Sequence, residues 1–177
     1  MAGTPTGDIR NLAVVGHSGA GKTSLCEAIL HATGATNRLG SVADKTSHLD
    51  VDDEEKESGH SIDSHVMSVF HDGKLLNFID TPGAPDFIGP AIASLAAAET
   101  AIIVVNAIGG IQVNTRRMRE QAKNFGLGRV IVVNHMDAES EALDQLVKDI
   151  RESFGQVVAP VNLPANGGKA VINCIEN

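Results

Sequence analysis

The sequence predicts an α/β fold with a mostly parallel sheet and helices on both of its faces. Two observations predict this class. Short apolar segments, typical of strands buried on both faces, alternate with segments whose apolar residues repeat at helical spacing. A glycine-rich segment also joins the first apolar run to the first helical pattern. With 177 residues, 42% of them hydrophobic, the chain is long enough for a core of its own, and we expect one domain over 1–177.

The first half of the chain is expected to form a strand, a helix and a hairpin. The apolar run 12–15 predicts a buried strand, and apolar residues at helical spacing predict a helix over about 22–33. Residues 40–60 are polar and strongly acidic, so we expect a mobile loop there. Two further strands are expected on either side of Asp72-Gly73, a dipeptide typical of hairpin turns.

The second half is expected to continue the alternation of helices and strands. An alanine-rich helix fits about 90–98, and two more helices are predicted at about 114–125 and 140–154, each followed by a glycine. The intervening runs 101–105 and 130–133 consist of apolar, mostly β-branched residues, and we expect two buried strands. In parallel sheets of this kind ligands bind at the carboxyl ends of the strands.

Composition narrows the class of partner. The net charge of −8 disfavours direct nucleic-acid binding, and the absence of Trp and Tyr removes the usual platforms for stacking bases. Nothing in the sequence resembles a secretory leader or a membrane span, so we expect a cytoplasmic domain with no membrane contact. The two cysteines, Cys26 and Cys174, are then expected to be free thiols.

Residues 16–23 carry the most informative motif, because they fit the phosphate-binding pattern G-x-x-x-x-G-K-[ST] between a strand and a helix. In such a loop, backbone N–H groups and the helix N-terminus bind phosphate oxygens. Lys22 is expected to reach the β- and γ-phosphates, and the Thr23 hydroxyl to bind Mg²⁺. The alternative is a glycine-rich turn without a ligand. The remaining loop residues expected to cradle the phosphates are Gly16, His17, Ser18, Gly19, Ala20 and Gly21.

A second motif, Asp80-Thr81-Pro82-Gly83, ends the second strand of the predicted hairpin. The Asp80 carboxylate is suited to hold Mg²⁺, usually through water. Gly83 lets a backbone N–H approach the γ-phosphate without a steric cost. The alternative is a turn with no role in binding, because the same four residues also make a good turn.

A third motif, Asn134-His135-Met136-Asp137, follows the strand predicted at 130–133. The Asp137 carboxylate is suited to accept both the ring and the exocyclic N–H groups of guanine, a donor pair that adenine lacks. Asn134 is expected to tie this loop to the phosphate loop. The alternative is that Asn134 or Asp137 only caps the next helix.

With these motifs in order, the chain resembles the G domain of translational GTPases, most of all elongation factor G and its paralogues, from about residue 9 to the end. Three further stretches carry the resemblance: E-S-G-H-S-I at 57–62, Asp86-Phe87, and N-A-I-G-G at 106–110. The resemblance implies GTP or GDP and Mg²⁺ as ligands, and in-line hydrolysis assisted by Lys22 and Gly83. It also implies the ribosome and the other domains of a longer factor as partners in translation elongation and translocation.

The resemblance also assigns the switch segments and predicts a truncation. The first switch is expected at about 40–62 and the second at about 80–90. Ser61 stands where the family has a Mg²⁺-binding Thr; the alternative is a solvated loop serine. Residues 161–164 resemble the start of an insert in the family's G domain, so we expect an N-terminal part without the last strand and helix.

The chain departs from the family's pattern at four places. Ala84 replaces the His that orients the attacking water, so hydrolysis is expected to be slow. His135 replaces a Lys that lies along the base, and Gly19 replaces an Asp in the phosphate loop. The guanine-contacting Ser-Ala motif is not found after residue 155, so we expect nucleotide binding weaker than about 1 μM.

Two other functions fit part of the pattern. An ATP-using P-loop phosphotransferase would keep the phosphate loop without a preference for guanine. A non-hydrolysing interaction domain would use the nucleotide only to set its conformation, and both Ala84 and His135 are compatible with it.

Five histidines outside the motifs are scattered and are expected to be structural or solvated rather than metal ligands. They are His31, His48, His60, His65 and His71.

Overall fold

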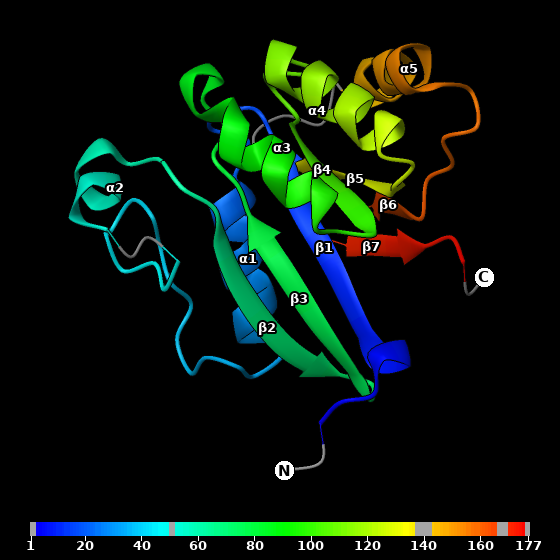
Figure 1. Cartoon of the computed structure of the whole chain (residues 1–177). Helices are drawn as coiled ribbons and strands as arrows, with labels where there is room; N and C mark the ends of the chain where they lie inside the picture. The colour runs from blue at the N-terminus through cyan, green and yellow to red at the C-terminus, as the bar shows by residue number, and fades with distance from the viewer. Residues whose placement is uncertain (1–2, 50–51, 137–142, 166–169, 176–177) are drawn as a thin grey trace.

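The computed structural model describes residues 3–49, 52–136, 143–165 and 170–175. The helices are α1 (Lys22–Ala32), α2 (Asp53–Ser58), α3 (Ile88–Ala96), α4 (Val113–Asn124) and α5 (Leu143–Phe154), with short 3₁₀ turns η1 (Thr6–Asp8) and η2 (Pro85–Phe87). The strands are β1 (Ile9–Gly16), β2 (His65–His71), β3 (Lys74–Asp80), β4 (Thr100–Asn106), β5 (Gly128–Asn134), β6 (Asn162–Ala165) and β7 (Ala170–Asn173). From β3 to β6 strands and helices alternate along the chain, after the pairs α1–α2 and β2–β3 and before the pair β6–β7 (Figure 1).

Five strands form one sheet in the order β2-β3-β1-β4-β5. β1 pairs in parallel with β3 and with β4, and β4 pairs in parallel with β5. β2 and β3 form an antiparallel hairpin that turns at Asp72 and Gly73, both of which have positive φ. The mostly parallel α/β fold and the hairpin are therefore as the sequence predicts.

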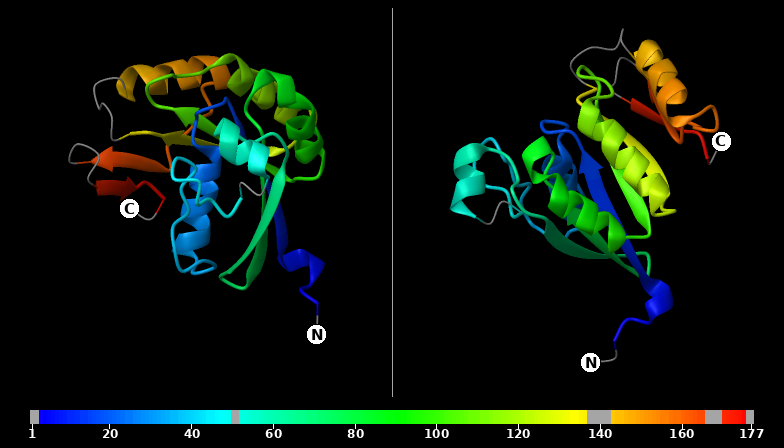
Figure 2. Two further views of the ribbon diagram at one scale, coloured as in Figure 1. Left: turned by 90° about the vertical axis from the view of Figure 1, so that its left-hand side faces the viewer. Right: turned by 45° about the horizontal axis from the view of Figure 1, so that its top comes forward.

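The core lies on both faces of the central strands. Successive residues of β1 point to opposite faces, so Ala13 and Val15 pack with α3, α4 and α5, while Val14 packs with α1. β4 divides in the same way, and both strands are almost fully buried. Figure 2 shows α1 on one side of the sheet and α3, α4 and α5 on the other. This two-sided burial explains why both strands read as continuous apolar runs.

Three features differ from the prediction. The segment 40–60 is not all loop, because α2 forms within it. β5 is the edge strand of the described sheet, so Val130 is 49% exposed and the next three residues are only half-buried, although a buried strand was expected. The hairpin of β6 and β7, a separate two-stranded sheet, was not predicted, since its strands are only four residues long.

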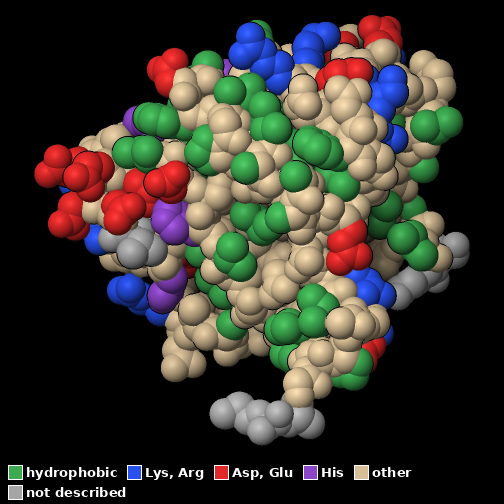
Figure 3. All heavy atoms as spheres, in the orientation of Figure 1, with side chains coloured by type: hydrophobic (Ala, Val, Ile, Leu, Met, Phe, Trp, Pro, Cys, Tyr) green, Lys and Arg blue, Asp and Glu red, His purple; other side chains and the backbone are tan. Residues whose placement is uncertain are grey.

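Surface charge is unevenly distributed. Acidic side chains gather over α2, whereas over α4 and α5 several Lys and Arg side chains lie among acidic ones (Figure 3). Both cysteines are free: Cys174 is exposed, and Cys26 is buried, which raises the pKa of its thiol.

Within the described ranges, the helices are too short or too polar to cross a bilayer.

Candidate functional site

The predicted motifs meet at the carboxyl ends of the parallel strands. β1 lies between β3 and β4, so the loops that follow these strands converge at one edge of the sheet. A pocket of about 320 Å³ opens there. It is lined by residues of the phosphate loop and α1, of the predicted switches, and of the loop after β5: Ser18, Gly19, Gly21, Lys22, Thr23, Ser24, Val42, Gly59, His60, Ser61, Gly83 and His135.

The phosphate loop joins β1 directly to α1. Gly19 and Gly21 have φ of 74° and 83°, in the left-handed region that favours glycine. At Gly21 space is a second constraint, because a Cβ there would collide with the Asn134 Nδ2. The Lys22 side chain is only 6% exposed, and its Nζ donates to the His17 carbonyl at 3.0 Å. Burial lowers the pKa of this ammonium, while the nearby Asp80 carboxylate opposes the shift.

Three side-chain oxygens from distant parts of the chain come together beside Lys22. The Thr23 Oγ1 donates to the Asp80 Oδ2 at 2.7 Å and lies 3.3 Å from the Ser61 Oγ. Asp80 is 1% exposed and Ser61 is 8% exposed, so Ser61 is not a solvated loop serine. A buried carboxylate with two hydroxyls is a hard, all-oxygen donor set, and such a set suits Mg²⁺.

Gly83 packs directly against the phosphate loop. A Cβ at this position would collide with the Lys22 Nζ and would lie 2.6 Å from the Ser18 backbone nitrogen. The Gly83 carbonyl accepts a hydrogen bond from the Asn114 Nδ2 at 2.8 Å, and Asn114 is 2% exposed on α4. Only glycine fits here, as the motif predicts. Asn114 was missed, because a polar residue in the first turn of a helix gives no sign of a partner 31 residues away.

Ala84 follows Gly83 in an extended conformation, with φ −73° and ψ 143°. It is partly exposed, and its methyl group can neither donate nor accept a hydrogen bond.

Two asparagines at strand ends hold the phosphate loop from the other side. The Asn134 Nδ2, at the end of β5, donates to the Ala20 carbonyl at 3.1 Å, which is the tie between loops that the sequence predicts. The Asn106 Nδ2, at the end of β4, donates to the Gly19 carbonyl at 3.3 Å. His135 lines the pocket with a positive φ of 60°. Asp137, the predicted guanine contact, lies outside the described residues.

Glu27, a buried carboxylate on α1, holds the first predicted switch against the phosphate-loop helix. One of its oxygens accepts hydrogen bonds from the Ser47 hydroxyl at 2.8 Å and from the backbone N–H groups of His48 and Leu49 at 2.5 and 3.3 Å. The other lies 2.8 Å from the His48 Nδ1. A Cβ on Gly40 would collide with the same carboxylate. No sequence pattern indicates this contact, since Glu27 is one acidic residue in an amphipathic helix.

Replacing Glu27 by alanine is expected to lower the free energy of unfolding by about 2–4 kcal/mol, because several donors lose their acceptor. Urea unfolding measures this loss, with exposed Glu54→Ala as the matched control, which is expected to change stability little. Burial raises the pKa of Glu27, but the hydrogen bonds from His48 and Ser47 outweigh it and the pKa falls below its ordinary 4.5. The ionised carboxylate therefore stabilises the fold above pH 4.5, and this contribution is lost as the pH falls through the lower folded-state pKa. Equal stability losses for the two variants would contradict the role of Glu27.

Comparison with known families identifies the fold. The sequence model described as the elongation factor Tu GTP-binding domain matches residues 7–173. The chain belongs to this family. The match contains the phosphate loop and both other predicted motifs, and it agrees with the resemblance that those motifs carry.

The curated relatives are longer proteins named after elongation factor G. The chain is 35% identical over 162 residues to an elongation factor G-like protein of Mycobacterium tuberculosis, covering 92% of this chain and 23% of the relative. It is 36% identical over 157 residues to an elongation factor G-like protein of Thermotoga maritima, covering 89% and 22%. It is 36% identical over 164 residues to elongation factor G 2 of Streptomyces coelicolor, covering 93% and 24%. The chain thus spans about a quarter of the length of these relatives.

A solved structure shows the same architecture. A crystal structure of a protein from Thermus thermophilus superposes with a TM-score of 0.88 at 36% identity, covering 93% of this chain and 25% of that one. The family's P-loop G-domain fold is therefore the fold of this chain.

Proposed function

We propose that the chain binds GTP and hydrolyses it to GDP and phosphate with Mg²⁺. One observation carries the proposal: Thr23, Ser61 and Asp80 meet beside the buried Lys22, at the mouth of the phosphate loop. The N–H groups of residues 16–23 and the α1 N-terminus bind the phosphates. Thr23, Ser61 and Asp80 hold Mg²⁺, which, when bound, offsets the negative charge of the phosphates.

Hydrolysis is an in-line attack of water on the γ-phosphorus. Lys22 and the Gly83 N–H donate to the oxygens on which charge develops, and the tight packing of Gly83 on the phosphate loop supports this role. Ala84 supplies no group that could orient the water. Turnover is therefore slow unless a partner supplies that group.

Base selection is assigned to the loop after β5. Asp137 accepts the two guanine N–H donors, His135 lies along the base, and Asn134 fixes the loop through the Ala20 carbonyl. The segments 40–62 and 80–90 act as the two switches, since both border the pocket and Glu27 and Asn114 hold them.

The names of the relatives suggest the cellular role. We place the domain in translation elongation and translocation on the ribosome, in the cytoplasm, as part of a longer factor whose other domains are its partners. The domain itself needs no membrane and no direct nucleic-acid contact for this role.

Asp137→Asn tests the choice of base. The variant is expected to bind GTP about 10²-fold more weakly or worse, because the buried guanine donors lose their charged acceptor, and to gain affinity for xanthosine triphosphate. Competition titrations with GTP, xanthosine triphosphate and ATP measure the change, with Asp72→Asn at the exposed hairpin turn as control. Equal affinity of the unmodified chain for ATP and GTP would favour an ATP-using phosphotransferase instead.

Ala84 gives specific support to a second function, a domain that binds GTP without hydrolysing it. Single-turnover hydrolysis measured with and without ribosomes separates the two functions. A rate that ribosomes raise supports the GTPase, and no turnover in either condition supports the non-hydrolysing switch.

A further inference from the structure

We propose a second cation site, formed by Asp52, Glu55 and His65, that binds a first-row transition metal such as Zn²⁺ between α2 and β2. One ligand atom from each of the three side chains lies within 4.8 Å of the others. Asp52 precedes α2, Glu55 lies on α2 and His65 begins β2, so a bound ion would join the short helix to the sheet. Two carboxylates and an imidazole are a donor set suited to Zn²⁺ and Mn²⁺.

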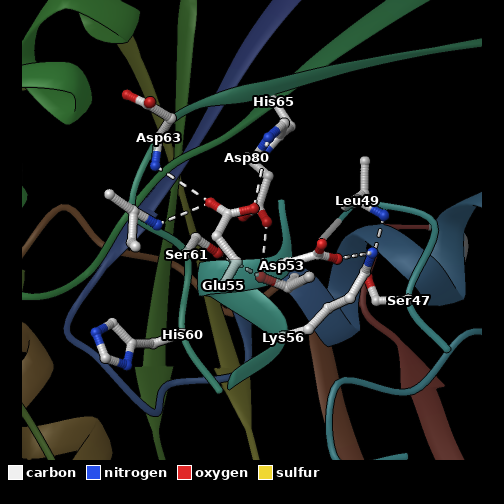
Figure 4. Close-up of polar contacts among 12 residues, drawn as sticks. Ser47, Leu49, Asp53, Glu55, Lys56, His60, Ser61, Asp63, His65 and Asp80 are labelled. Atoms are coloured by element: carbon white, nitrogen blue, oxygen red, sulfur yellow. Dashed lines mark hydrogen bonds and ion pairs between the residues drawn. The ribbon is translucent and has the colours of Figure 1, made fainter. Parts of the chain in front are cut away.

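The Glu55 carboxylate carries the proposal. Its Oε1 accepts hydrogen bonds from the Ile62 and Asp63 N–H groups at 2.8 and 3.2 Å, which fixes the side chain (Figure 4). Its Oε2 is buried, in a residue 1% exposed, and has no hydrogen-bond donor among the residues that the structure describes. A buried carboxylate oxygen without a donor is costly, and a cation would satisfy it.

The geometry around this oxygen fits a shared cation better than a hydrogen bond. The His65 Nε2 lies 3.6 Å from the Glu55 Oε2, too far for a hydrogen bond. Two ligands bound to one ion at about 2.1 Å in tetrahedral geometry lie about 3.4 Å apart. The pair is therefore close to the separation that a metal ion would impose.

Asp52 completes the set. An Asp at this position before a helix usually accepts a hydrogen bond from the first turn, but the Asp52 side chain makes no such bond. Its side chain is exposed, and one of its carboxylate oxygens lies within 4.8 Å of the Glu55 and His65 ligand atoms, so it is placed to join them at one ion. Acidic side chains around α2 add to the attraction of a cation (Figure 3).

The proposed site is separate from the nucleotide's Mg²⁺ site in its ligands and in its chemistry. His65 pairs with Asp80 across β2 and β3, so the two sites are neighbours. The first uses only oxygen ligands, and the second includes an imidazole, which Mg²⁺ disfavours. A bound transition metal would hold the first switch on the sheet and so favour the conformation described above.

Calorimetric titration of the chelator-treated chain with Zn²⁺ tests the proposal, in excess Mg²⁺ and in a Cys174→Ser background that removes the exposed thiol. One equivalent is expected to bind and to raise the melting temperature. Glu55→Gln keeps the acceptor for Ile62 and Asp63 but loses the charge, and it is expected to weaken Zn²⁺ binding about 10- to 100-fold or more. Asp52→Asn and His65→Ala are expected to weaken it as well, and both Asp52 and His65 lie at least partly exposed to solvent.

The matched controls are Asp53→Asn and His71→Ala, two exposed residues next to the site or on the same strand, which are expected to bind Zn²⁺ normally. Absence of stoichiometric Zn²⁺ binding would overturn the proposal. So would binding that survives Glu55→Gln and His65→Ala but is lost in Asp80→Asn, because the ion would then occupy the nucleotide's Mg²⁺ site. Since GTP takes no part in the titration, the outcome does not depend on the proposed GTPase function.

Discussion

Replacing Lys22 by alanine is expected to weaken GTP binding by about 10²- to 10³-fold. The phosphates would lose a charged hydrogen-bond donor at a position that is largely shielded from water. The Lys22 ammonium is almost fully buried, and it already contacts the loop that is to bind the phosphates. Burial lowers its pKa, so a bound phosphate would stabilise the charged form. Calorimetric titration with GTP and Mg²⁺ measures the loss.

The control for this experiment is Lys123→Ala, at an exposed position on α4 away from the pocket, which is expected to bind GTP normally. Thermal unfolding of both variants shows whether the fold is intact. Removal of a buried charge is not expected to unfold the domain, since alanine is a good residue for the first turn of a helix. Affinities within about threefold of each other for Lys22→Ala and the unmodified chain, a difference of under 1 kcal/mol, would show that phosphates do not bind at this loop.

Ala84→His is expected to raise the single-turnover rate of GTP hydrolysis by about 10²- to 10⁴-fold, the usual contribution of a side chain that positions or deprotonates a water. The position accepts a larger side chain, because its backbone is extended and the residue is partly exposed. GTP affinity is expected to stay the same, since the added imidazole contacts the water rather than the nucleotide.

Ala84→Phe is the matched control, because it adds a ring of similar size without a hydrogen-bonding group. The rate is measured with and without ribosomes, so that a requirement for the stimulating partner is not mistaken for inactivity. If the His and Phe variants hydrolyse GTP at the same rate as the unmodified chain in both conditions, Ala84 does not limit hydrolysis.

Much of the fold followed from local patterns. The central strands were predictable because burial on both faces requires continuous apolar runs. The phosphate loop and the Asp80–Gly83 motif were predictable because their glycines are required by close neighbours, as at Gly21 and Gly83. The short helix α2 was not predictable, since its sequence is entirely polar and its buried Glu55 bonds to residues that follow the helix.

The parts of the site that the sequence did not reveal are long-range contacts of ordinary residues. Glu27 reaches residues 47–49, and Asn114 reaches Gly83, and neither residue belongs to a motif. His65 was expected to be structural or solvated because it has no metal-binding spacing in the sequence. The fold places it 3.6 Å from a carboxylate ten positions earlier in the chain, across a turn that no pattern predicts.

The central claim is that one nucleotide bridges the phosphate loop and the loop after β5. A crystal structure of the chain with GDP and Mg²⁺ tests it most directly. We predict the phosphates on the N–H groups of residues 16–23 with the Lys22 ammonium beside them, and the guanine against the Asp137 carboxylate. A nucleotide whose phosphates lie elsewhere on the surface, or whose base makes no contact with Asp137, would contradict the account.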